Sequence, residues 1–174
     1  SESALGTAKR GYSTATAIAA PDTYAEALAG QASVIFHRGR DAGNVDGVLK
    51  DALKGFKAAM RHGYNGLSYR AEMGEILTGH RRLLDAAVVF RSILDDIKAS
   101  RAGEQPFGHG EILSCLRNHE TTALTGLANV RVLQGRILDA ANCFASIVTV
   151  TPSDLQAKLQ HGLCLRSTVA NEHR

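Results

Sequence analysis

The sequence is poor in aromatic residues, proline and cysteine. Aromatic residues make up 5% of its 174 residues, tryptophan is absent and there are three prolines. A sheet-rich interior draws on aromatic and β-branched residues, whereas alanine and leucine favour helices. The composition therefore predicts an all-α chain whose length suits one domain. The three cysteines, an odd number, fall within helical patterns and are expected to be buried thiols in a reducing compartment: Cys115, Cys143 and Cys164.

Motifs of catalysis and of cofactor binding are also missing. The sequence has no glycine-rich phosphate loop, no Gly-x-Ser-x-Gly elbow and no apolar run of the roughly 20 residues that span a membrane. Cys115 and His119 lie four residues apart, with His109 upstream, but no second paired motif completes a metal site. We therefore expect no enzyme activity, no cofactor and no metal. A formal charge of +3 is too small to make nucleic acid the expected partner.

A six-residue core recurs three times along the chain. The copies are Asp51–Phe56, Asp85–Phe90 and Asp139–Phe144, and the first two start 34 residues apart. The third starts 54 residues after the second, which is one more period plus an insertion of about 20 residues. Around the core, Arg82–Leu94 and Arg136–Val148 are identical at eight of thirteen positions. A period of this length indicates stacked helical hairpins.

The apolar periodicity and the turn residues predict where each helix lies. Expected helices cover residues 23–36, 46–61, 67–77, 83–97, 111–134 and 137–150. The first is expected to break at Gly39–Gly43 and the fifth near Asn118, and residues 99–110 form an inserted loop. A last helix, capped by Ser153, should cover the end of the array through its leucines, which are Leu155, Leu159, Leu163 and Leu165.

The repeats resemble the tetratricopeptide repeat family, which uses a small residue, an alanine, an aromatic and often a proline at fixed positions. The residues that match are Ala52, Phe56, Gly74, Ala86, Phe90, Ala128, Ala140, Phe144, Pro152 and Gly162. Departures are Arg40 at the small position of the first repeat and Lys98 in place of the second repeat's proline. The resemblance implies a right-handed superhelix of about three hairpins with a C-terminal covering helix. It spans residues 22–170, between an N-terminal extension at 1–21 and a tail at 171–174.

Such a fold implies a noncatalytic scaffold subunit that binds other proteins. Residues 1–20 are rich in Ser, Thr, Ala and Gly and contain a single acid, Glu2, as organellar transit segments do. We therefore expect a mitochondrial complex, such as a respiratory, ATP synthase or ribosomal assembly, with plastid or cytoplasm as alternatives. A free adaptor is a second hypothesis, in which a concave groove binds a peptide through Arg70, Met73, Leu77 and Val130. Recognition of RNA by the repeats is a third.

One charged pattern predicts a contact surface. Lys50, Lys54, Lys57 and Arg61 recur every three or four residues, which places them along one side of a helix, and Arg38 and Arg40 would widen the patch. Such a stripe is either a solvated outer face or a contact for an acidic protein, an anionic lipid or RNA.

Overall fold

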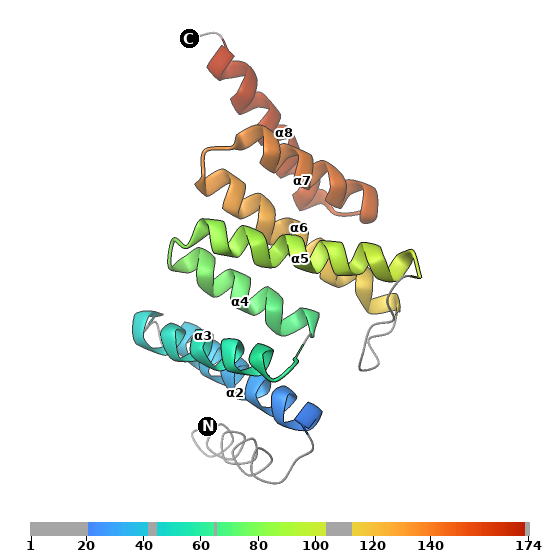
Figure 1. Cartoon of the computed structure of the whole chain (residues 1–174). Helices are drawn as coiled ribbons and strands as arrows, with labels where there is room; N and C mark the ends of the chain where they lie inside the picture. Colours follow the sequence, from blue (N-terminus) through green and yellow to red (C-terminus); the bar gives the residue numbers. More distant parts are fainter. Residues whose placement is uncertain (1–20, 42–44, 65, 104–112, 173–174) are drawn as a thin grey trace. The chain divides into compact units, whose positions relative to one another are not determined.

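The computed structural model describes residues 21–41, 45–64, 66–103 and 113–172 (Figure 1). Within these residues all regular secondary structure is helical, which confirms the all-α prediction. The helices are α2 (Pro21–Asp41), α3 (Val45–Arg61), α4 (Leu67–Gly79), α5 (Leu83–Arg101), α6 (Leu113–Leu133), α7 (Ile137–Val150) and α8 (Leu155–Glu172). The chain divides into two compact units, Ser1–Ile76 and Leu77–Arg174, with the boundary inside α4.

In the first unit α2 packs against α3 over small residues. Helix α3 buries its apolar side, including Ala52 and Phe56, and exposes the opposite side. Gly55 on α3 faces Ala32 on α2 so closely that an added Cβ would lie 2.8 Å from the Ala32 Cβ. The two helices therefore approach to a distance that only glycine permits at this crossing. His37 on α2 also forms an ion pair of 3.4 Å with Glu72 on α4.

In the second unit each helix from α5 to α8 packs against the next (Figure 1). Phe90 of α5 is buried with its ring against Gly126 of α6, where an added Cβ would lie 2.3 Å from the ring. Arg101 and Glu120 join the same two helices through a bidentate ion pair, with N–O distances of 3.0 and 2.6 Å. A second apolar cluster holds α6, α7 and α8 together, and it contains Leu124, Ala128, Ala140, Ala141, Phe144, Ile147, Ala157 and Cys164.

The turns that precede α5 and α7 have the same backbone geometry. In each, the last residue before the new helix donates its N–H at 2.8 Å to a carbonyl near the end of the old one, Arg82 to Leu77 and Arg136 to Arg131. The preceding residues have positive φ, 59° at Arg81 and 73° at Gly135. This combination is the Schellman motif, which ends a helix and satisfies its last carbonyls.

The same two turns carry equivalent ion pairs. Arg82 pairs with Asp85 and Arg136 pairs with Asp139, each at 2.5 Å. Both aspartates stand in the first turn of their helix, where a carboxylate is favoured by the helix dipole. The second and third copies of the sequence repeat are therefore two copies of one structural element.

Most predicted helix positions are correct, but several details are wrong. Helix α2 continues through Gly39 to Asp41, and α6 continues through Asn118 without a break. Helix α5 extends to Arg101, so the loop predicted at 99–110 begins three residues later than predicted, and residues 104–110 lie outside the described part. The cap of α8 is Asp154 rather than Ser153, because the Asp154 Oδ1 accepts the Ala157 N–H at 2.9 Å.

Candidate functional site

The most unusual surface of the described chain is the outer face of α8. Its large apolar side chains are 39–75% exposed, and they are Leu155, Leu159, Leu163, Leu165 and Val169. The leucines that were expected to cover the array therefore face solvent, while Ala157 and Cys164 on the other side of the helix are buried. A helix that caps a repeat array normally presents a polar outer face, whereas α8 presents an apolar one.

The register of the repeats explains why this face is open. Residues 34 positions apart in α6 and α8 correspond, so Leu124, Ala128 and Arg131 match Lys158, Gly162 and Leu165. The three α6 residues are buried, and two of them belong to the cluster that α6 shares with α7. Their α8 counterparts are exposed, and a Cβ added at Gly162 would meet no atom within 4 Å. The positions through which α6 holds its next helix are therefore exposed in α8, where no described residue covers them.

The outer face of α8 is cationic as well as apolar. Lys158 and Arg166 are exposed on it, and the helix contains no acidic residue before Glu172. An apolar stripe flanked only by cations is complementary to an amphipathic helix that carries acidic residues.

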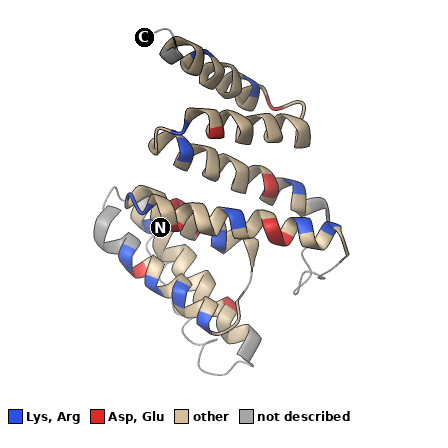
Figure 2. Cartoon of the chain, turned by 45° about the horizontal axis from the view of Figure 1, so that its top comes forward, with Lys and Arg blue, Asp and Glu red and all other residues tan. Residues whose placement is uncertain are grey.

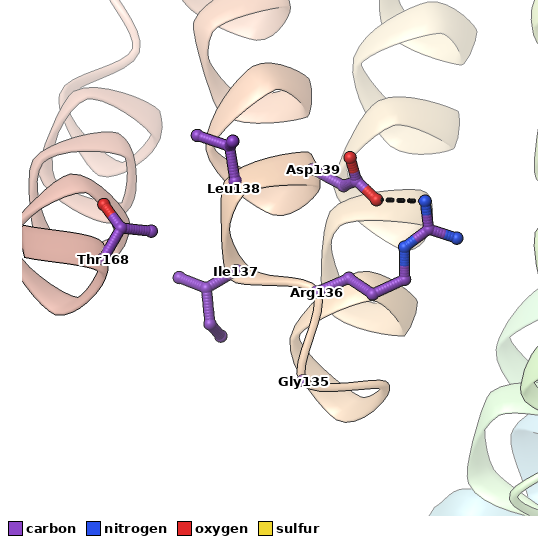
Figure 3. A pocket seen from close by; sticks show the side chains of 6 residues that line it. All are labelled: Gly135, Arg136, Ile137, Leu138, Asp139 and Thr168. Carbon is purple, nitrogen blue, oxygen red and sulfur yellow. Dashed lines mark ion pairs between the residues drawn. The ribbon is translucent and has the colours of Figure 1, made fainter. Parts of the chain in front are cut away.

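A shallow hollow of about 350 Å³ lies on the inner side of α8 (Figure 3). Thr168 of α8 faces Ile137 and Leu138 at the start of α7, while the ion pair of Arg136 and Asp139 extends in the opposite direction. No ionisable group lies on the Thr168 side of this hollow among its lining residues. It has the character of a packing gap between two helices rather than of a reaction centre.

The basic stripe predicted on α3 is exposed along its whole length. Lys50, Lys54, Lys57 and Arg61 share the side of α3 that points away from its buried residues, and Figure 2 shows Lys and Arg recurring along this helix. None of the four forms an ion pair with a described residue. Arg38 on α2 is also exposed, whereas the side chain of Arg40 lies outside the described part.

The residues proposed to line a peptide groove are buried. The exposed fractions range from 6% at Arg70 to 0% at Val130, with Met73 and Leu77 between them. A side chain in this state packs against its neighbours and offers no surface to a peptide. Helical periodicity identified these positions as the inward side of their helices, but it could not distinguish a packed interior from an open groove.

The residues assigned to repeat packing divide into two groups. Buried positions are Ala52, Phe56, Gly74, Ala86, Phe90, Ala128, Ala140 and Phe144. Pro152 and Gly162 are exposed, and a Cβ added at Gly162 would meet no atom within 4 Å. Gly162 is instead a small residue at the centre of the open α8 face.

The cysteines differ in their surroundings, and the prediction that all three are buried is wrong for Cys115, which is exposed. Cys143 is partly buried and Cys164 is buried, and burial raises the pKa of both thiols above the ordinary value. Among the described residues no group of three or more His, Cys, Asp and Glu side chains is placed to hold a metal ion. His109, the third ligand considered, lies outside the described residues.

None of the described helices is both long enough and apolar enough to cross a membrane. Searches against protein-family models, curated proteins and solved structures find no match to this chain.

Proposed function

We propose that this chain is a noncatalytic, tetratricopeptide-like scaffold subunit that is held in a larger protein complex. The observation that carries the proposal is the open apolar face of α8. A run of exposed leucines along one helix face lowers solubility unless another surface covers it. The transit-like composition of residues 1–20 favours an organelle, and the mitochondrion in particular, as the location of that complex.

The occupant of this face is proposed to be an amphipathic helix with acidic flanks, supplied by a partner subunit. Apolar residues of that helix would lie against Leu155, Leu159 and Leu163, close to the backbone at Gly162. Acidic side chains at its edges would pair with Lys158 and Arg166. A second copy of this chain is a poorer occupant, because two α8 faces would bring these cations together.

Replacing Leu159 with glutamate tests the proposed face. The change places a charge at the centre of the apolar stripe, and because Leu159 is 56% exposed the fold should be retained. We expect the tagged variant to lose its place in the complex, with an affinity at least about tenfold weaker, since burying an unpaired charge costs more than 1.4 kcal/mol. Native-gel separation of gently solubilised source material would reveal the loss.

The matched control is Leu84→Glu, an exposed leucine on α5 that is 77% exposed and outside the face. It should leave the complex intact. A carbodiimide cross-link between Lys158 and an acidic segment of one fixed partner would identify the occupant. Unchanged migration of Leu159→Glu at the mass of the complex would show that α8 is not the interface.

The basic stripe on α3 supports a second, weaker contact within the same complex. Each lysine or arginine near an anionic membrane contributes about 1 kcal/mol, so four give about 4 kcal/mol, which corresponds to a millimolar dissociation constant. That is too weak for stable attachment to lipid through the stripe alone. We therefore assign the stripe to an acidic protein surface that binds together with α8.

Reversing two charges of the stripe, Lys54→Glu with Lys57→Glu, should make the complex more sensitive to salt. Both side chains are exposed, so the fold should be unaffected. The measurement is the salt concentration at which the chain leaves the high-mass band, which we expect to fall for the variant because opposite charges no longer face the partner. Identical salt profiles for the variant and the original chain would remove the stripe from the interface.

A further inference from the structure

An open cavity at the surface of the second unit is lined by three arginines. Its volume is about 220 Å³, and its walls are formed by α5, α6, α7 and the turn before α7. The lining residues are Arg91, Leu127, Arg131, Arg136, Asp139, Asn142 and Cys143. The lining contains three cationic side chains and one carboxylate. This excess of positive charge is concentrated around a space large enough for a small ligand.

The most informative of these residues is Arg131. It is 5% exposed, and its one side-chain hydrogen bond among the described residues goes from Nη1 to the Gln134 Oε1 at 2.7 Å. Gln134 is neutral, so it does not balance the charge. Burial lowers the pKa of Arg131, and nearby Arg136 and Arg91 lower it further, outweighing Asp139. A guanidinium nevertheless remains charged at neutral pH, so the cation is buried without a carboxylate of its own.

No other lining group supplies the missing negative charge. Asp139 is paired with Arg136 at 2.5 Å, and Figure 3 shows this pair directed away from Thr168 and α8. Burial raises the pKa of the Cys143 thiol, so the thiol stays neutral at pH 7. Asn142 is uncharged. The lining therefore carries a net charge of about +2 by the ordinary ionisation of its side chains.

The corresponding place in the preceding repeat has a different lining. Arg82 and Asp85 reproduce the ion pair, but Leu77 stands where Arg131 stands, and Val88 and Val89 stand where Asn142 and Cys143 stand. The turn and its ion pair therefore form equally well when the neighbouring side chains are apolar. The buried arginine and its polar surroundings are specific to the third repeat, and packing of the repeat does not explain them.

We infer that this cavity binds a small oxyanion, a carboxylate or a phosphate group, between Arg91 and Arg131. Planar guanidinium groups donate paired hydrogen bonds to both kinds of group. The volume is below the roughly 300–1,000 Å³ of sites that enclose drug-sized ligands, so it suits a single anionic group rather than a nucleotide. The anion would be either a free ion or an acidic side chain of a partner protein. The inference does not depend on the α8 interface.

Calorimetric titration of the whole chain tests this site at constant ionic strength. The probes are inorganic phosphate and N-acetylglutamate amide, with chloride as the reference ion. Arg91→Gln should weaken binding about tenfold, because it removes a charge-assisted donor from an exposed residue without disturbing the core. Asp139→Asn should strengthen binding several-fold, because it removes the competing carboxylate and releases Arg136.

The matched control is Asp85→Asn, which breaks the equivalent pair beside Leu77 and should leave the dissociation constants unchanged. Binding of phosphate alone would identify the ligand as a free ion, and binding of the glutamate probe would identify it as an acidic side chain. Absence of binding by both probes would overturn the inference. Equal binding by the original chain, Arg91→Gln and Asp139→Asn would overturn it as well, because the arginine cavity would then not be the site.

Discussion

Replacing Phe90 with alanine is expected to lower the free energy of unfolding by about 3–5 kcal/mol, the largest loss that we predict for a single change. Phe90 is 1% exposed and is the largest fully buried side chain of the chain's described part. Its ring fills the space opposite Gly126, so truncation removes buried apolar area and leaves a cavity between α5 and α6. Urea unfolding followed by circular dichroism would measure the change.

Val88→Ala is the control for the Phe90 substitution, because Val88 lies two residues earlier on the same helix and is 64% exposed. Its effect should stay within about 0.5 kcal/mol. The comparison separates loss of packing from any general weakening of α5. A loss below about 1 kcal/mol for Phe90→Ala would contradict the close contact of α5 with α6.

Replacing Gly55 with alanine should also destabilise the chain, here by about 1–3 kcal/mol. The new Cβ would lie 2.8 Å from the Ala32 Cβ and 3.5 Å from its Cα, and neither atom can rotate away. Helices α2 and α3 must therefore separate, and this cost exceeds the gain of up to about 1 kcal/mol in helix propensity. The same unfolding measurement would report the loss.

Gly162→Ala is the matched control for Gly55→Ala, with the opposite expected sign. Its Cβ would meet nothing within 4 Å, so only the gain in helix propensity remains, and stability should rise by about 0.5–1 kcal/mol. The double variant Ala32→Gly with Gly55→Ala should recover part of the lost stability by restoring the space. Equal effects of alanine at Gly55 and Gly162 would show that α2 and α3 do not touch as closely as the structure indicates.

The sequence predicts the elements of this fold better than it predicts their faces. The limits of α7 were correct, because Gly135 before it and Pro152 after it are strong local signals. Gly39 and Asn118 were expected to break helices, but their weak helix propensity costs about 1 kcal/mol or less, which neighbouring contacts can offset. Local signals of this size are reliable where they agree with the packing and unreliable where they oppose it.

The face of α8 could not be assigned from periodicity because both sides of the helix contain apolar residues. The leucines at Leu155, Leu159 and Leu163 give the stronger pattern, yet Ala157 and Cys164 are buried. Small side chains allow α7 and α8 to approach closely, and this advantage becomes visible only when the neighbouring helix is in place. Corresponding positions of α6 and α8 are 34 residues apart, which matches Gly162 to Ala128. This correspondence was the available signal that the leucines lie on the side of α8 to which a further helix could pack.

The arginine cavity was missed for a related reason. Arg131 lies in the last turn of α6, where the helix dipole favours a cation. This interpretation gives no reason to expect that the side chain is buried. Alignment of the repeats places it opposite Leu77, a position that is buried in both copies. An arginine at a position that is apolar in the other repeat was the signal in the sequence.

The shared turn of the second and third repeats has a consequence for how the chain reaches its fold. Helices α5 and α7 both pack on α6, and their first thirteen residues, counted from Arg82 and Arg136, are identical at eight positions. During refolding from denaturant we expect the two helices to compete for this shared neighbour, and at high concentration we expect chains to exchange α5 or α7, as in domain-swapped dimers. Synthesis on a ribosome removes the competition, because α5 emerges and can settle on α6 before α7 exists. The yield of correctly paired chain should therefore depend on the order in which its helices appear.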